Sequence, residues 1–271
     1  MEVNFSLEEF IILCFVLGAD TIVGLEDNAN LLQSSPDELR EIWLRVASSL
    51  QEKRFIGSVA EGAVEIDAGI HTLISACAWP KRVLRTQITN SGSAGLIQTN
   101  YYFHEAGIVV ITQNAQAEGQ LTVRYLDDIE EALQILQGQL EGISAPLEEE
   151  ASTHPVSVSL DRTQYYDFLS PVYMRNAGKA ARVLHGAGLE ESFALDAAQG
   201  FVGRERFISL SQWLPEGDTA VELSMCYIAE AGCWVIEMPD QADCVIRLTR
   251  QSFAAIKQAC NHIFGETPMA E

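Results

Sequence analysis

The chain has 271 residues, of which 48% are hydrophobic and 20% are charged, which is the balance of a folded globular protein with an ample core and not of a disordered one. Its 17 basic and 38 acidic residues give a formal net charge of −21, and such a field repels phosphate backbones and anionic lipids. Nucleic acids and acidic membranes are therefore poor candidate partners, and the composition favours basic ones.

The first predicted element is a buried helix from about Leu7 to Leu17. Ser6 and Glu9 have the spacing of a capping box, with Ser at the N-cap and Glu at the third helical position. The apolar run from Phe10 to Gly18 is too short to span a bilayer, and glutamates precede it where a signal peptide carries Lys or Arg. The sequence therefore predicts a cytoplasmic protein that does not insert into membranes.

Two further helices are predicted before the first long strand. Ser35 suits an N-cap, Pro36 the first helical position and Glu38 the third, and apolar residues follow at helical spacing. The next helix begins near Asp67 and ends before Pro80. A possible short ribbon between these helices would give a winged-helix shape, but acidic residues counter the basic ones there, so DNA binding is not favoured.

Alternating sequence then predicts four antiparallel strands, over residues 82–89, within 96–113 as a hairpin, and over 120–126. Glu105-Ala106-Gly107 is typical of a short hairpin turn, with Gly107 suited to a left-handed backbone. Asp127 is expected to cap a closing helix from Ile129 to Leu140. The strands at 82–89 and 96–104 are separated by a small polar loop, which consists of Asn90, Ser91, Gly92, Ser93, Ala94 and Gly95.

Residues 143–155 contain two prolines and three adjacent glutamates, a composition typical of a linker. We therefore predict an N-terminal half at 1–142 and a C-terminal half at 156–271, within one compact unit. The second half repeats the order of the first: helical sequence, four strands and a final helix at about 251–264.

The two halves also have identical residues at aligned positions. Residues 102–113 and 227–238 agree at six of twelve aligned positions, and Gly107 falls on Gly232 as an equivalent turn. Ser159-Leu160-Asp161 is similar to Ser6-Leu7-Glu8, and this alignment gives the first half about 28 additional residues before its hairpin. Arg124 aligns with Arg247, which leaves a two-residue length difference in a turn. The pattern predicts an internal duplication; the alternative is that two hairpins have converged on similar turns.

The search for chemical motifs favours a protein without catalytic activity. The five histidines and six cysteines form no metal-binding pattern, and the cysteines are typical of buried, reduced thiols. His104 is replaced by Ala229 in the repeat, which indicates a half-exposed strand residue and not a site. The glycine-rich segments lack the remaining residues of a phosphate loop or a nucleophile elbow. Paired carboxylates lie at helix starts and on polar faces. The sequence therefore predicts no catalytic residue, no metal site and no cofactor.

Several segments together have a recognisable order: the opening SLEEFIILCFVLGAD, the helix LREIWLRVASSLQEKRFIG with VEID and GIHTLISACAWP after it, and the strands RVLRTQIT and GLIQTNYYFHEAGIVVIT. In this order of segments the chain resembles the EspG-type chaperones of type VII (ESX) secretion systems. The resemblance implies an α+β fold in which a central antiparallel sheet is flanked by two helical bundles with pseudo-twofold symmetry. It also implies a cytosolic, non-enzymatic adaptor that binds helical-hairpin secreted proteins and keeps them soluble for export.

In that family the binding surface includes a sheet hairpin loop and the C-terminal helical bundle. The loop corresponds by position to Asn90, Ser91, Gly92, Ser93, Ala94 and Gly95, which are small and polar enough to adapt to a partner. We expect a monomer or a weak homodimer. The alternative functions are a small-molecule-binding or enzymatic sheet-helix domain and an acidic regulator of transcription that acts through other proteins.

Overall fold

The computed structural model describes most of the chain. The predicted loop from Asn90 to Gly95 and nearly all of the predicted linker lie outside the described residues. The described ranges are 1–19, 22–25, 35–60, 63–89, 96–114, 119–143, 156–203, 206–214, 219–229, 232–237 and 245–265.

Helices and strands are both abundant, as the predicted α+β class requires. The strands are β1 (Glu2–Ser6), β2 (Ile56–Ala60), β3 (Ala63–Ile66), β4 (Arg82–Thr89), β5 (Leu96–His104), β6 (Gly107–Asn114), β7 (Gln120–Leu126), β8 (Ser157–Leu160), β9 (Phe207–Leu214), β10 (Thr219–Ile228), β11 (Cys233–Glu237) and β12 (Ile246–Gln251). The helices are α1 (Leu7–Val16), α3 (Pro36–Glu52), α4 (Ala68–Ala78), α5 (Ile129–Glu141), α6 (Arg162–Tyr173), α7 (Ala177–Gly186), α8 (Glu191–Gly203) and α9 (Phe253–Gly265).

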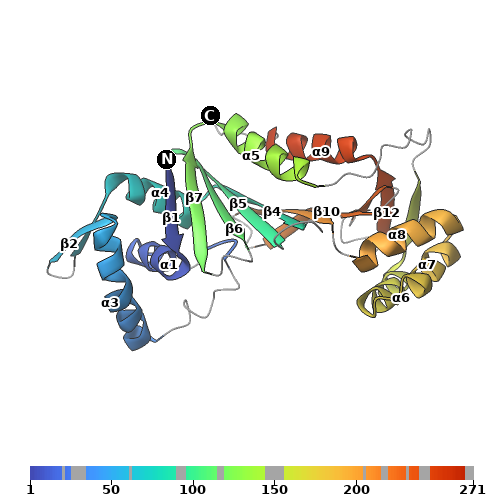
Figure 1. Cartoon of the computed structure of the whole chain (residues 1–271), viewed down its shortest axis with the longest axis horizontal. Helices are drawn as coiled ribbons and strands as arrows, with labels where there is room; N and C mark the ends of the chain where they lie inside the picture. The colour runs from blue at the N-terminus through green and yellow to red at the C-terminus, as the bar shows by residue number, and fades with distance from the viewer. Residues whose placement is uncertain are drawn as a thin grey trace. The chain divides into compact units, whose positions relative to one another are not determined.

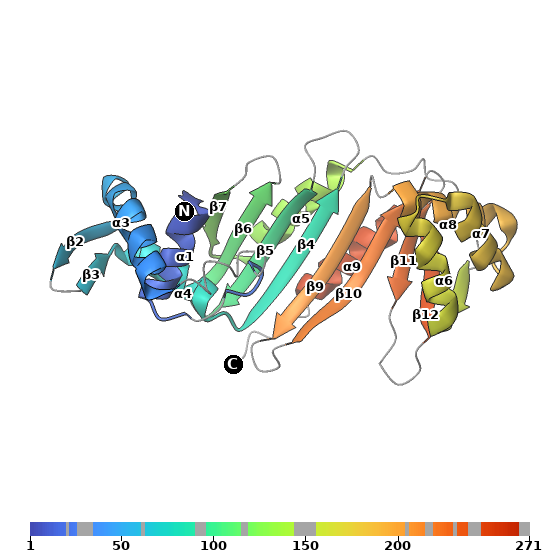
Figure 2. The same cartoon turned by 90° about the horizontal axis from the view of Figure 1, so that it is seen from below.

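Ten of these strands form a large antiparallel sheet in the order β1-β7-β6-β5-β4-β9-β10-β11-β12-β8, and β2 and β3 form the separate ribbon expected after α3. The predicted α+β class with a large antiparallel sheet is therefore confirmed. Within each half of the chain the strands follow the same order, from β4 through β5, β6 and β7 to β1, and from β9 through β10, β11 and β12 to β8 (Figure 2).

The chain divides into two compact units. The first consists of Met1–Arg85, Ile97–Ala132 and Gln212–Val221, and the second of Thr86–Leu96, Leu133–Ser211 and Glu222–Glu271. Helices α1, α3 and α4 belong to the first unit, and α6, α7, α8 and α9 to the second.

Local capping starts the helices of the first unit where the sequence predicts. Both boxes are formed: the Ser6 hydroxyl accepts the Glu9 amide N–H at 3.1 Å, and the Ser35 amide donates to Glu38 Oε2 at 2.7 Å. At α5 the expected cap is wrong by one residue, because Asp128 and not Asp127 accepts the Glu130 amide, at 2.9 Å. The side chain nearest the helix start reaches the free N–H groups.

The prediction of four strands in each half omitted the outer strand. β1 pairs antiparallel with β7, with Glu2 opposite Arg124, and β8 pairs in the same way with β12. These strands are five and four residues long, too short for an alternating pattern to distinguish them from the approach to a helix cap. Their partners lie far along the chain, so only the folded sheet identifies them.

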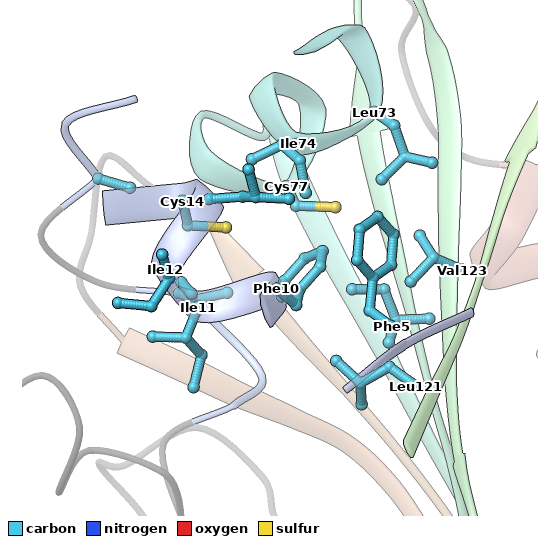
Figure 3. Packing of buried hydrophobic residues seen from close by; sticks show 14 of the residues in the cluster. Phe5, Phe10, Ile11, Ile12, Cys14, Leu73, Ile74, Cys77, Leu121 and Val123 are labelled. Atoms are coloured by element: carbon cyan, nitrogen blue, oxygen red, sulfur yellow. The ribbon is translucent and has the colours of Figure 1, made fainter. Parts of the chain in front are cut away.

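The core of the first unit forms where α1 and α4 cover β1 and β7 (Figure 1). Phe5 of β1 and Phe10 of α1 are fully buried with ring centroids 5.8 Å apart, an edge-to-face contact. Figure 3 shows these rings among Leu73 and Cys77 of α4 and Val123 of β7. The apolar run after Ser6 is thus a core helix, and within the described residues no helix combines the length and apolar composition that crossing a bilayer requires.

The hydrogen-bonding registers of the two halves correspond at a constant offset of 125 residues. Tyr102 lies opposite Val109 and Tyr227 opposite Trp234. The amide of Lys81 donates to the Phe103 carbonyl, and the counterpart pair joins the Ile228 amide to the Arg206 carbonyl. These registers are what an internal duplication predicts, and the duplication itself stays a prediction.

Two of the sequence alignments between the halves are wrong by two residues. Arg124 faces Val110 and Glu2, and the residue in that place in the second half is Thr249, which faces Val235 and Ser157. An alignment by residue identity pairs Arg124 with Arg247 instead, because two identical residues score better than an arginine and a threonine.

The same shift applies at the helix start. The N-cap equivalent to Ser6 is Asp161, which forms its own capping box with Gln164, whereas Ser159 lies within β8. Seventy-five positions separate Ser6 from Lys81 and 45 separate Asp161 from Arg206, so the first half carries 30 additional residues and not 28.

A candidate partner-binding surface on helices α6, α7 and α8

Of the residues predicted to bind a partner or to form turns, the two glycines are among the described residues and the loop is not. Asn90 to Gly95, outside the described residues, connect the neighbouring strands β4 and β5. Gly107 begins β6 after the turn at Glu105 and Ala106 and has a φ of 146°, a left-handed value that favours glycine.

Both glycines lie against other chain segments. A Cβ on Gly107 would be 2.7 Å from the Leu126 carbonyl oxygen, and one on Gly232 would be 2.5 Å from Nε of Arg250. The Gly232 carbonyl accepts the Ala229 amide at 2.9 Å across the second hairpin. His104 is half-buried, and its Nδ1 accepts the Ala106 amide at 3.1 Å, so it contributes to the turn.

The other part of the expected surface, the C-terminal helices, is described throughout. Asp161 caps α6 and Asn176 caps α7. The side-chain oxygen of Asn176 accepts a hydrogen bond of 3.0 Å from the Lys179 amide. Between the helices Arg175 has a φ of 53°, and its amide donates to the Val172 carbonyl at 3.0 Å. This left-handed residue ends α6 and reverses the chain into α7.

Aromatic contacts join these helices to the sheet of the second unit. Phe168 of α6 meets Phe201 of α8 edge to face at 5.1 Å, and Phe201 lies 4.2 Å from the Tyr227 ring of β10. The Trp234 indole N–H donates to Asp196 at 2.8 Å. Figures 1 and 2 both show α6, α7 and α8 side by side next to β12. The buried faces of the helices are therefore fixed by the strands they cover.

The outward faces of the same helices carry large apolar side chains. Tyr166 is 57% exposed, Tyr173 68% and Met174 67%, and Leu195 of α8 is exposed as well. Tyr166 and Tyr173 are seven residues apart, two helical turns, and so share one face of α6. Single exposed apolar residues are ordinary, but several large ones on one helical group make this face a candidate for contact with another protein.

Burial raises the pKa of several cysteine thiols in the cores. Burial raises the pKa of Cys260 to about 11, and a hydrogen bond with Cys233, together with burial, raises that of Cys226. All five described cysteines are buried free thiols. In the part of the chain that the structure describes, no three His, Cys, Asp or Glu side chains are grouped to hold a metal ion.

The exposed tyrosines were not singled out from the sequence. Their signal is present: Tyr166 and Tyr173 repeat at a helical spacing on the side of α6 away from Phe168 and Val172. It is weak, because a helix with aromatic residues on two sides looks equally like a helix buried on both.

Comparison with known proteins rests on structure. No family model matches the chain, and no curated protein is similar enough in sequence to be matched. The chain is similar to the Mycobacterium tuberculosis type VII secretion system chaperone EspG5, solved in complex with the PE25-PPE41 dimer. The TM-score is 0.63 and the identity 9%, over 100% of this chain and 98% of that chain. The expected resemblance to the EspG chaperones is thus confirmed at the level of the fold.

Proposed function

We propose that this chain is a non-enzymatic, cytoplasmic chaperone or adaptor that binds a helical secreted protein of a type VII secretion system and keeps it soluble for export. The observation that carries the proposal is the similarity to EspG5 over the whole length of both chains. That protein was solved with a bound dimer, and the exposed side chains of α6 and α8 offer this chain a surface for a comparable partner.

The surface has the properties of a protein-binding face. Tyrosine and methionine are enriched at protein interfaces, because tyrosine offers a large area with little rotamer entropy to lose and methionine adapts to its partner's shape. Tyr166 and Tyr173 lie on a helix whose other face is held by Phe168, and Met174 is the C-cap of that helix, so they require no rearrangement of the core to make contacts. The loop Asn90 to Gly95 is proposed as the second part of the surface.

The test is co-expression with helical-hairpin proteins encoded beside this chain. We expect a stable complex, at a 1:1 ratio by light scattering, in which the partner is soluble and without which it aggregates. Tyr166→Ser combined with Met174→Ser should weaken the complex by about tenfold or more, since interface aromatic and methionine side chains each contribute about 1 kcal/mol or more.

A matched control removes equally exposed apolar side chains elsewhere. Leu44 of α3 is 66% exposed and Trp79, after α4, is 51% exposed, so Leu44→Ser with Trp79→Ser should leave the complex unchanged. If no neighbouring product forms a complex, or if the control pair weakens it as much as the α6 pair does, the proposal is wrong.

A further inference from the structure

The charge of α6, α7 and the turn between them is opposite to that of the whole chain, whereas α8 is acidic. Residues 162–189 contain four basic side chains, Arg162, Arg175, Lys179 and Arg182, and one acidic side chain, Asp167. This segment has a formal charge of +3 in a chain whose net charge is −21. All five charged side chains are exposed. The segment that carries the exposed tyrosines is therefore basic in an acidic protein, with the exposed carboxylates of Asp161, Glu190 and Glu191 at its two ends.

Three of these basic residues have no carboxylate partner among the described residues. Elsewhere Arg45 pairs with Glu8, Lys53 with Glu9, Lys81 with Glu105 and Arg124 with Glu2, at 2.6 to 3.0 Å. Arg175, Lys179 and Arg182 take part in no such pair in the described parts of the chain. With 38 acidic residues in the sequence, carboxylates are plentiful, yet none lies within ion-pair distance of these three in the described ranges.

Two of the three also stand where helix electrostatics disfavours them. Arg175 directly precedes the N-cap of α7, and Lys179 is in its first turn, which contains no acidic residue. The amino end of a helix carries partial positive charge, so acidic residues stabilise it and basic residues do not. Residues that break a local rule in a folded protein are often there for function and not for stability.

The positive charges follow one face of α7 and continue toward the tyrosines. Lys179 and Arg182 are three residues apart within α7 and so lie on the same side of that helix, and Arg175 is in the turn that directly precedes its N-cap. Tyr173, Met174 and Arg175 are consecutive and exposed. At the start of α6, the Arg162 guanidinium lies over the Tyr166 ring at 5.8 Å. Cationic groups thus lie on both sides of the exposed apolar ones, with Arg162 before Tyr166 and Arg175 directly after Met174.

From this arrangement we infer that the partner of the proposed chaperone presents an acidic amphipathic helix, whose carboxylates pair with Arg175, Lys179 and Arg182 while its apolar residues cover Tyr166, Tyr173 and Met174. The inference rests on the proposed function for its biological setting. It reverses the expectation that so acidic a chain takes basic partners. The remaining acidic surface repels an acidic helix everywhere else, which directs it to this face.

The test uses two synthetic amphipathic helices labelled with fluorescein. Both have the same leucine face, and one carries glutamate and the other lysine on the polar face. We expect fluorescence anisotropy to show that the glutamate peptide binds at low salt. Its Kd should rise about tenfold between about 50 and about 300 mM NaCl, because exposed ion pairs are screened by salt.

Charge reversal at the site should abolish the preference. The variant R175E/K179E/R182E should weaken binding of the glutamate peptide by about tenfold or more, which is what three exposed ion pairs of ordinary strength provide. A matched variant, R40E/R54E/R247E, makes the same change in net charge at exposed arginines outside α6 and α7 and should leave the Kd within about twofold. Circular dichroism and urea unfolding identify any variant that has lost its fold, and R175Q/K179Q/R182Q, which only neutralises the charges, then replaces it.

Several outcomes would overturn the inference. The glutamate peptide fails to bind, the lysine peptide binds as tightly, or the two reversal variants weaken binding equally. Binding to vesicles that contain phosphatidylserine, lost in R175E/K179E/R182E while the glutamate peptide does not bind, would identify an anionic lipid as the occupant.

The two proposals can fail separately. If the co-expressed partner forms a complex that neither salt nor R175E/K179E/R182E weakens, the chaperone proposal stands and the acidic helix is wrong. If the glutamate peptide binds as expected but no neighbouring product forms a complex, the surface is established and the export role is wrong.

Discussion

Glu9 is the residue whose chemistry is most constrained by the fold. It is 2% exposed, and its carboxylate accepts three hydrogen bonds of 2.7 Å, from the Ser6 amide, the Ser49 hydroxyl and the Lys53 ammonium. Burial alone would raise the pKa of this carboxyl, but the hydrogen bonds from Lys53, Ser49 and Ser6 and the charge of Lys53 outweigh it, and the pKa is lowered. The residue that completes the cap of α1 therefore also joins α1 to α3.

We predict that Glu9→Gln lowers the free energy of unfolding by about 1–3 kcal/mol near pH 7, because it leaves Lys53 without its partner and weakens a buried hydrogen-bonded group. The folded-state pKa lies below the unfolded one, so this contribution is present above the unfolded pKa and is lost as the pH falls through the folded value. Urea unfolding from pH 7 to pH 3 should show the difference between wild type and variant shrinking below about pH 4.5.

Glu8 provides the control at the neighbouring position. Its ion pair with Arg45 is exposed on both sides, so Glu8→Gln should cost less than about 1 kcal/mol. Equal losses for the two variants would contradict the account of Glu9 as a buried link between two helices.

Among the single elements, α8 illustrates how small residues set the distance between a helix and the sheet. Ala194, Ala197 and Ala198 are fully buried, and a Cβ on Gly200 would lie 3.1 Å from the Ala229 Cβ. That distance is tighter than ordinary van der Waals contact, so the helix lies as close to β10 as a glycine permits. The close approach brings Asp196 within reach of Trp234.

This packing predicts opposite results for two helical glycines. Gly138 of α5 has open space around its Cα, so Gly138→Ala should stabilise the protein by about 0.5–1 kcal/mol through helix propensity. Gly200→Ala should gain nothing or lose stability, because the new methyl group crowds Ala229.

The double variant Gly200→Ala with Ala229→Gly separates the two effects. It should recover part of the propensity gain, measured as a coupling free energy of about 0.5 kcal/mol or more by urea unfolding. Stabilisation by Gly200→Ala alone, equal to that of Gly138→Ala, would show that α8 can move away from the sheet without cost.

For the whole molecule the dominant physical property is its net charge of −21. Repulsion between like charges destabilises a compact state, and dissolved salt screens it over a distance of about 10 Å at 0.1 M. Three ion pairs, Arg45 with Glu8, Lys81 with Glu105 and Arg124 with Glu2, are substantially exposed on both sides and contribute little. Repulsion should therefore outweigh the ion pairs.

We predict that the urea midpoint of unfolding rises as NaCl increases from about 20 mM to about 500 mM, with a gain on the order of 1 kcal/mol. R175E/K179E/R182E, which makes the net charge more negative by six, should show a steeper rise. A midpoint that falls with salt would mean that ion pairs contribute more than repulsion costs.

Features that depend on neighbouring residues could be predicted from the amino-acid sequence alone. The capping boxes at Ser6 and Ser35 place the starts of α1 and α3, and alternation places β4 to β7, because these signals act within a few residues. The resemblance of the segments to the EspG chaperones also indicated the fold that the comparison with EspG5 confirmed.

Features that depend on distant partners required the folded chain. β1 becomes a strand because β7 pairs with it, and Glu2 lies opposite Arg124, which is 122 residues later. Thr249 corresponds to Arg124 in the second half because the two residues have equivalent strand partners, although their side chains differ. The basic and aromatic face of α6 and α7 was identified in the same way. Its residues form no motif in the sequence. Only the packing of the helices against the core decides which of their side chains are exposed to solvent.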